Sequence, residues 1–203
     1  MSVRAEARGL SKRFGGLQAL ASVSFAIDAG QVLAVIGPNG AGKSTLINCL
    51  SGAVAADTGS VAIDGRAVPP RFNDRLVELG ITRTFQHVRL FPSLTALEHL
   101  LLARRSFERT VRCAARGRAQ AICLDLLDRV GLAAKAGQRP SELAYGEQRR
   151  LEIARGLATE PLLFLVDELA AGSTATEQVA LAGLIEGIAA AARRCCWSST
   201  TWT

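Results

Sequence analysis

The 203-residue sequence predicts a single α/β domain, residues 1–203, built around a mainly parallel central sheet. Short continuous apolar runs at residues 31–36 and 162–166 are typical of strands buried on both faces. The first run is followed by a glycine-rich loop and then by an apolar helical stretch at residues 46–50. Between the two runs, apolar residues recur at helical spacing in three segments, residues 94–102, 119–130 and 146–159.

The remaining elements have local signals of their own. Residues 22–28 alternate in part between polar and apolar side chains, which predicts a strand before the glycine loop. Residues 59–64 predict another strand, which is closed by the turn residues Asp64 and Gly65. Pro161 ends the last predicted helix, because proline cannot continue the hydrogen-bond pattern of a helix interior. The order of elements favours an α/β fold.

Composition excludes several classes of protein. Hydrophobic residues make up 49% and charged residues 21% of the chain, so it is not a disordered tail. The five cysteines are odd in number and form no CxxC pair, which argues against a disulfide framework or a zinc ribbon. No apolar run approaches the ~18 residues of a membrane-spanning helix. We therefore expect a cytoplasmic chain, soluble or peripheral to a membrane.

The net charge of +6 originates in one segment. Residues 71–118 contain ten arginines and four acidic residues, whereas charges balance in the rest of the chain. No nucleic-acid-binding module accompanies these arginines, so we expect a solvated face and no nucleic-acid partner. A surface near anionic lipid or an acidic partner is the alternative.

The glycine-rich loop is the strongest functional signal. Residues 37–44 match GxxxxGK[ST], in which glycines let backbone N–H groups turn onto phosphates beside a helix amino terminus. Lys43 is predicted to reach the β- and γ-phosphates, and the Ser44 hydroxyl to hold Mg²⁺. A structural glycine turn is the alternative. The loop residues predicted to contact ATP are Gly37, Pro38, Asn39, Gly40, Ala41, Gly42, Lys43, Ser44 and Thr45.

Two acids follow the second apolar run. Asp167 stands at the carboxyl end of a predicted buried strand, where an α/β nucleotide site needs a metal ligand, so we assign it to Mg²⁺. Glu168 is then placed to polarise the attacking water as a general base. A pair of solvated acids at a strand end is the alternative interpretation.

Two further motifs narrow the class of nucleotide-binding protein. Residues 142–150, Glu-Leu-Ala-Tyr-Gly-Glu-Gln-Arg-Arg, resemble the signature motif of ABC transporter ATPases, usually written LSGGQ. Residues 80–86, Gly-Ile-Thr-Arg-Thr-Phe-Gln, resemble the Q-loop of the same family, and all motifs occur in the family's order. Residues 13–17, 83–91 and 143–155 look most like the ATPase subunits of bacterial branched-chain amino acid importers.

This resemblance implies a P-loop NTPase (RecA-like) fold, with an amino-terminal antiparallel part and a helical subdomain inserted at about residues 93–140. It implies an ATPase that powers transport by ATP-driven dimerisation, at the cytoplasmic face of the inner membrane. The implied partners are a second ATPase subunit paired head to tail, transmembrane permease subunits and, indirectly, a periplasmic solute-binding protein. Urea or short amides are alternative solutes. ABC ATPases acting on nucleic acid or ribosomes usually carry two cassettes, which 203 residues do not accommodate.

The resemblance also assigns roles to single residues. Phe14 is implied to stack on adenine, although its residue type alone favours a core or strand-edge position. Gln86 is implied to touch the metal and to take part in catalysis together with Lys43 and Glu168. Ala144 replaces the usual signature serine. The signature residues implied to contact ATP are Tyr145, Gly146 and Glu147.

The sequence departs from the family after Glu168. Leu169 replaces the usual proline, and Ser173 stands where leucine is usual. Residues 193–203 contain both tryptophans and two of the five cysteines, an abrupt change of composition that marks an aberrant tail.

The genetic code suggests a cause for this tail. When the last base of each codon is read with the first two of the next, residues 193–203 permit Ala-Leu-Leu-Leu-Val-Glu-His-Asp-Met-Asp. That sequence resembles the family's next strand and its histidine switch. The hypothesis is a frameshift near residues 190–194 that truncates the family pattern, which predicts weak or absent hydrolysis and, as the alternative function, a nucleotide-binding remnant. Residues 195–203 are β-prone in part, so a strand that takes the place of the missing one is an alternative, but their polar Ser and Thr run is expected to suit a central strand poorly.

Overall fold

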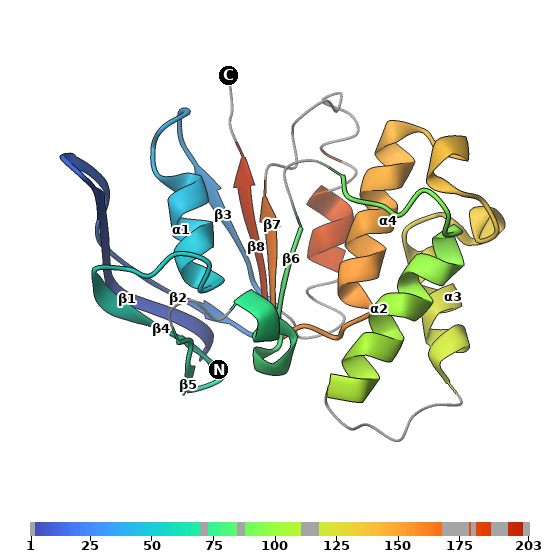
Figure 1. Ribbon diagram of the computed structural model, residues 1–203, viewed down its shortest axis with the longest axis horizontal. Coiled ribbons are helices and arrows are strands. Elements are labelled where there is room, and N and C mark those ends of the chain that lie inside the picture. The colour runs from blue at the N-terminus through green and yellow to red at the C-terminus, as the bar shows by residue number, and fades with distance from the viewer. Residues whose placement is uncertain are drawn as a thin grey trace. The chain divides into compact units, whose positions relative to one another are not determined.

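The computed structural model describes residues 3–69, 73–84, 88–110, 118–167, 179, 182–187 and 195–200. The chain divides into two compact units (Figure 1). The first unit comprises Met1–Arg83 and Leu162–Thr203, and the second comprises Thr84–Pro161. In the described parts of the chain, no helix combines the length and apolarity needed to cross a bilayer.

The first unit contains an antiparallel sheet with the strand order β2-β1-β4-β5, as the sequence resemblance predicted. Its strands are β1 (Val3–Phe14), β2 (Leu17–Asp28), β4 (Thr58–Ile63) and β5 (Arg66–Ala67). Strand β1 was not predicted, although Ala5, Ala7 and Leu10 face the core from it. The short side chains of the two alanines conceal the alternation that a strand signal requires.

A second sheet in the same unit is parallel throughout and confirms the predicted fold class. Its strands are β3 (Val32–Ile36), β8 (Cys195–Thr200), β7 (Leu163–Asp167) and β6 (Ile81–Arg83), in the order β3-β8-β7-β6 (Figure 1). In β7, residues 163–166 are at most 1% exposed, as predicted. The predicted burial of β3 is wrong: it is the edge strand of this sheet, and its residues are half-buried or exposed.

Strand β8 lies between β3 and β7, so residues 195–200 form a central strand although their polar run was expected to suit one poorly. Its backbone pairs with β3 from Val32↔Cys196 to Ile36↔Thr200, and with β7 from Leu163↔Cys195 to Asp167↔Ser199. These pairs satisfy backbone N–H and C=O groups whatever the side chains are, and a gap here would leave two rows of them unpaired. The frameshift hypothesis stays a prediction, because residues 188–194 lie outside the described part of the chain.

Helix α1 (Lys43–Leu50) shares one hydrophobic core with both sheets of the first unit. Ile47 and Leu50, spaced three apart on one helix face, are at most 2% exposed and join Leu10 of β1 and Leu165 of β7 in this core. Arg83 Nη1 also donates to Asn48 Oδ1 at 2.6 Å, which ties β6 to the helix. Helix α1 is therefore held in a fixed position against both sheets. A 3₁₀ helix, η1 (Asn73–Leu79), precedes β6.

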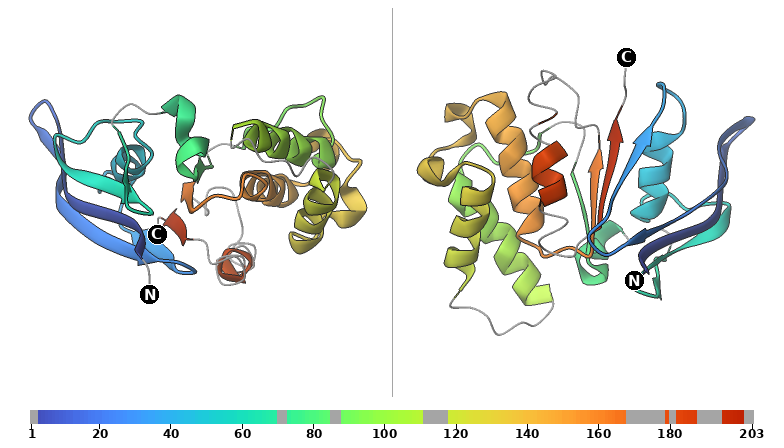
Figure 2. Two further views of the ribbon diagram at one scale, coloured as in Figure 1. Left: turned by 90° about the horizontal axis from the view of Figure 1, so that it is seen from below. Right: turned by 180° about the vertical axis from the view of Figure 1, so that it is seen from behind.

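The second unit is helical. It contains α2 (Ala96–Thr110), α3 (Ala119–Arg129), η2 (Ala133–Lys135), η3 (Pro140–Glu142) and α4 (Tyr145–Leu157). The three α-helices lie side by side (Figure 2) and enclose Leu100, Leu127 and Leu151, which are fully buried. All three correspond to predicted helical segments, and α4 packs against α2 and α3. The bounds expected for the inserted helical subdomain stay a prediction.

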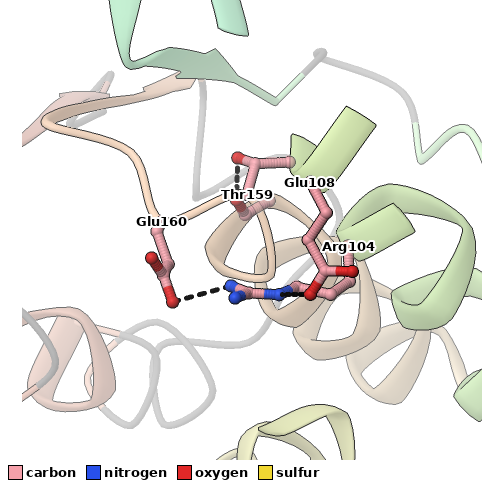
Figure 3. A network of polar contacts seen from close by, with 5 residues as sticks. Arg104, Glu108, Thr159 and Glu160 are labelled. Atoms are coloured by element: carbon pink, nitrogen blue, oxygen red, sulfur yellow. Dashed lines mark hydrogen bonds and ion pairs between the residues drawn. The ribbon is translucent and has the colours of Figure 1, made fainter. Parts of the chain in front are cut away.

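Arg104 connects α2 to the residues that follow α4 (Figure 3). Its side chain is 3% exposed, and its guanidinium contacts Glu108 Oε1 at 2.8 Å and Glu160 Oε1 at 2.6 Å. Arginines and acids interrupt the apolar pattern in this stretch, so periodicity predicted the helix only as far as residue 102, although the expected helical insertion includes the rest of α2. The buried charge is compensated by two carboxylates.

Candidate functional site

The predicted phosphate loop lies between β3 and α1, in the expected order strand, loop, helix. Residues 38–41 are exposed, and Ala41 N donates to Pro38 O at 3.2 Å across a tight turn. Gly40 and Gly42 have φ angles of 82° and 85°, in the left-handed region that favours glycine. The loop therefore presents exposed backbone at a helix amino terminus, where phosphate oxygens find N–H donors.

Gly42 is required by space as well as by conformation. It immediately precedes α1, and a Cβ atom at this position would lie 2.3 Å from Ala19 O of β2. No real Cβ contact is that short, and Ala19 O is a backbone atom that has little freedom to move. The close approach of β2 thus fixes the position at which α1 begins.

Lys43 spans the loop. Its Nζ atom donates to Gly37 O at 2.6 Å and to Pro38 O at 2.8 Å, while its side chain is half-buried. The ammonium group is therefore held at the loop, the position from which it can reach an anion. Ser44 is exposed and Thr45 is half-buried at the start of the helix. The geometry fits a triphosphate.

The carboxyl ends of β3 and β7 lie at the same edge of the parallel sheet. Asp167 is the last residue of β7 and pairs with Ser199 of β8, while Ile36, the last residue of β3, pairs with Thr200. One strand separates β3 from β7, which places the two ends about 10 Å apart. This edge is where α/β folds bind ligands.

The remaining members of the predicted metal and catalytic set lie outside the described residues. The side chain of Asp167 and the whole of Glu168 and Gln86 belong to this group, so their roles stay predictions. Among the described residues, no group of three or more histidine, cysteine, aspartate and glutamate side chains forms a metal site.

Phe14 is not a core residue. It ends β1, pairs with Leu17 across the hairpin turn, and is 50% exposed. The Lys12 ammonium lies 5.5 Å from its ring centroid and also contacts Asp57 Oδ1 at 2.7 Å. The exposed ring leaves surface on which a flat base can stack, whereas the core interpretation from residue type is wrong.

The signature segment forms the start of α4. Tyr145, the first helical residue, is 44% exposed, and Ala144 precedes it with extended backbone. Gln148 Nε2 donates to Pro140 O and Leu143 O, both at 3.0 Å, which anchors the chain that enters the helix. Gln148 was not among the predicted site residues.

Glu147 forms its ion pair and its hydrogen bond within the second unit. Its carboxylate contacts Lys135 Nζ at 2.8 Å and accepts a hydrogen bond from Ala144 N at 3.1 Å. The Lys135 hydrogen bond, followed by the Ala144 hydrogen bond, holds the pKa of Glu147 below its ordinary value. These contacts hold the Glu147 side chain against the backbone of Ala144, the N-cap residue of α4, so its contact with ATP stays a prediction. No sequence pattern links Lys135 to Glu147, which explains why Lys135 was missed.

His99 is buried in the second unit. Its Nε2 atom accepts from Phe91 N at 2.9 Å, and its Nδ1 atom lies 2.8 Å from Thr95 O, which fits a neutral ring that donates from Nδ1. Burial is the largest cause that lowers the pKa of His99. Arg155 Nη1 also donates to Arg89 O at 2.5 Å, so α2 and α4 together hold the described segment 88–91.

Comparisons with known proteins agree with this geometry. The ABC transporter family model matches residues 20–171. The branched-chain amino acid transport ATP-binding protein LivG of Salmonella typhimurium is 41% identical over 187 residues, which cover 87% of this chain and 73% of LivG.

Two solved structures are similar over nearly the whole chain. An ATP-binding cassette of an ABC transporter in its ADP conformation is 25% identical, with a TM-score of 0.84 over 100% of this chain and 83% of that chain. A dimeric cassette in a post-hydrolysis state, bound to ADP and Pi, is 26% identical, with a TM-score of 0.78 over 97% of this chain and 87% of that chain. The family model covers well over half of the sequence, and the chain therefore belongs to the ABC transporter family, as an ATP-binding protein.

Proposed function

We propose that the chain is the ATP-hydrolysing subunit of a bacterial importer for branched-chain amino acids, bound at the cytoplasmic face of the inner membrane. The observation that carries the proposal is Lys43, which spans an exposed phosphate loop at the sheet edge shared with Asp167. The similarity to LivG supports the class of solute. Urea and short amides are the alternative solutes.

Each residue of the site has a defined task. Lys43 and the N–H groups of residues 40–45 bind the phosphates, and the exposed ring of Phe14 stacks on adenine. The Ser44 hydroxyl, Asp167 and Gln86 would hold Mg²⁺, since they are oxygen donors of the kind it prefers. Mg²⁺, when bound, draws charge from the phosphate oxygens. Glu168 accepts a proton from the attacking water.

The active form is a head-to-tail dimer in which the amino terminus of α4 from one subunit faces the ATP on the phosphate loop of the other. The exposure of Tyr145 at that terminus and the dimeric cassette bound to ADP and Pi support this arrangement. Permease subunits are the direct membrane partners, and a periplasmic solute-binding protein acts through them.

The test of the enzymatic part is Mg²⁺-dependent ATP turnover by the purified chain. Glu168→Gln is expected to lower kcat at least ~100-fold while ATP still binds, because the amide accepts no proton. The control is Glu6→Gln, which removes one partner of the exposed ion pair with Arg8 and should leave kcat unchanged. Equal turnover by the wild type and Glu168→Gln would contradict the assignment.

The test of the solute is uptake by a Salmonella typhimurium strain that lacks LivG. The wild-type chain is expected to restore uptake of labelled leucine, whereas Glu168→Gln is not. Restored uptake of urea without leucine would replace the proposed solute by its alternative.

A second candidate is a subunit that binds ATP but turns it over slowly. The aberrant composition of residues 193–203 favours this candidate, because it stands where the family's histidine switch is expected. Turnover should be compared between the printed chain and a variant whose residues 193–203 are replaced by Ala-Leu-Leu-Leu-Val-Glu-His-Asp-Met-Asp. Equal turnover by the two chains would exclude this candidate.

A further inference from the structure

Glu147 places a negative charge in the first turn of α4. A helix amino terminus attracts anions through its unpaired N–H groups and its dipole, and a free carboxylate beside it opposes the approach of another anion. If this terminus meets the γ-phosphate of ATP, as the proposed function requires, the charge of Glu147 has to be compensated.

The compensating cation is Lys135. Its Nζ atom lies 2.8 Å from the Glu147 carboxylate, and Glu147 Oε2 accepts from Ala144 N at 3.1 Å. The Glu147 side chain is 17% exposed and the Lys135 side chain 37%, so the pair is partly shielded from water. The same carboxylate is thus held by a cation on one side and by the backbone of the helix entry on the other.

The backbone around Lys135 fixes the lysine in place. Lys135 N donates to Leu132 O at 3.0 Å, Gln138 N donates to Lys135 O at 3.0 Å, and Leu132 is fully buried. Arg150 Nη2, the other cation near Glu147, lies 3.7 Å away, beyond hydrogen-bond distance. Lys135 is therefore the principal partner of Glu147.

We propose that Lys135 is a positioning residue for the reaction with ATP. Lys135 neutralises Glu147 and holds its carboxylate against the backbone N–H of Ala144. In this way it keeps the amino terminus of α4 ready to accept the γ-phosphate of the ATP that a second subunit binds. The inference rests on the proposed function and assigns Lys135 a task within it.

The test compares Lys135→Met, Glu147→Gln and the double variant. Lys135→Met should raise the ATP concentration for half-maximal turnover roughly tenfold, because the carboxylate keeps only the more distant Arg150, 3.7 Å away, as a cationic partner. Its kcat should change less than about twofold, and ATP binding by the dilute monomer should not change, since the phosphate loop is intact. The double variant should lie closer to the wild type than Lys135→Met does, and it should match Glu147→Gln, because glutamine carries no charge to compensate. Arg8→Met, which breaks an exposed ion pair, is the control.

Two results would overturn the inference: an unchanged half-saturating concentration in Lys135→Met, or a double variant as impaired as Lys135→Met. The second result would mean that Lys135 acts by packing alone. A wild-type chain without turnover would contradict the proposed function instead. Hydrogen exchange of the Ala144 amide then decides the inference, since faster exchange in Lys135→Met supports it and unchanged exchange overturns it.

Discussion

Gly42 is the residue at which the phosphate loop is most sensitive to a single added carbon. Gly42→Ala would place a Cβ atom 2.3 Å from Ala19 O at a φ of 85°, so we expect a loss of at least about 2 kcal/mol in the free energy of unfolding. Gly40→Ala is the matched control: its φ is 82°, but no atom lies within 4 Å, so only about 1 kcal/mol of backbone strain is expected. Urea unfolding measures both, and equal losses would contradict the role of Ala19.

Titration of His99 makes the free energy of unfolding depend on pH. Burial lowers its pKa below the ordinary value of 6.5, so below pH 6.5 the unfolded chain binds a proton that the folded chain resists. The stability that neutral His99 contributes is present above pH 6.5 and is lost as pH falls towards the lowered pKa. Arg155 and Glu98 are the charged groups that act on it, in opposite directions.

The expected result is a free energy of unfolding that falls between pH 8 and pH 5.5, by at most about 1.4 kcal/mol per pH unit for this one proton. His99→Gln removes the titrating group and should flatten the slope. Urea unfolding at the two pH values measures it, and the same slope in wild type and variant would show that His99 is not its source.

Some site residues were predictable from sequence because their chemistry is local. Lys43 and the loop glycines occupy consecutive positions between a strand and a helix, so one motif predicts their geometry. Lys135 and Ala19 were not predictable, because they meet Glu147 and Gly42 only through tertiary packing. Residue type alone did not indicate that Phe14 is exposed, because aromatic rings mostly pack in protein cores, and only the structure shows that this ring is exposed.

At the scale of elements, Arg104 couples α2 to the end of α4 (Figure 3). Arg104→Met would leave Glu108, which is 6% exposed, without its cation, so we expect a loss of about 3 kcal/mol in the free energy of unfolding. Adding Glu108→Gln should restore most of the loss by removing the buried charge. Thermal or urea unfolding measures both variants. An additive loss in the double variant would mean that the charge of Glu108 is not what the arginine compensates.

Some strands were predictable from the sequence and others were not, for physical reasons. β7 was predicted because its side chains are apolar and buried on both faces. β8 is defined by its backbone pairing with β3 and β7, and a pattern of side chains does not reveal such pairing. The burial of β3 was overestimated because an apolar run does not reveal whether a strand lies at an edge. Helices α3 and α4 were predicted within a few residues.

At the scale of the whole molecule, two compact units carry the two halves of the proposed site. The first holds the phosphate loop and the strand that ends at Asp167, and the second holds the amino terminus of α4. Under the proposed function, a nucleotide site is completed between two copies of the chain. The sequence order of the motifs was sufficient to predict the fold class, because each motif lies at the end of a strand or the start of a helix.

The origin of residues 193–203 is a prediction at the same scale. Resequencing the gene through the codons for residues 185–203 and beyond should show an open frame that encodes Glu-His-Asp after a one-base change. A confirmed sequence whose alternative frame lacks Glu-His-Asp would contradict the frameshift hypothesis.

The central claim is that ATP binds to this chain through its phosphate loop. The most direct test is calorimetric titration of the purified chain with ATP and Mg²⁺, beside Lys43→Met. We expect one site per chain in the wild type and at least ~10-fold weaker binding in the variant, because a charge-assisted contact to the phosphates is lost. Equal affinity in the two chains, or no binding by the wild type, would contradict the claim.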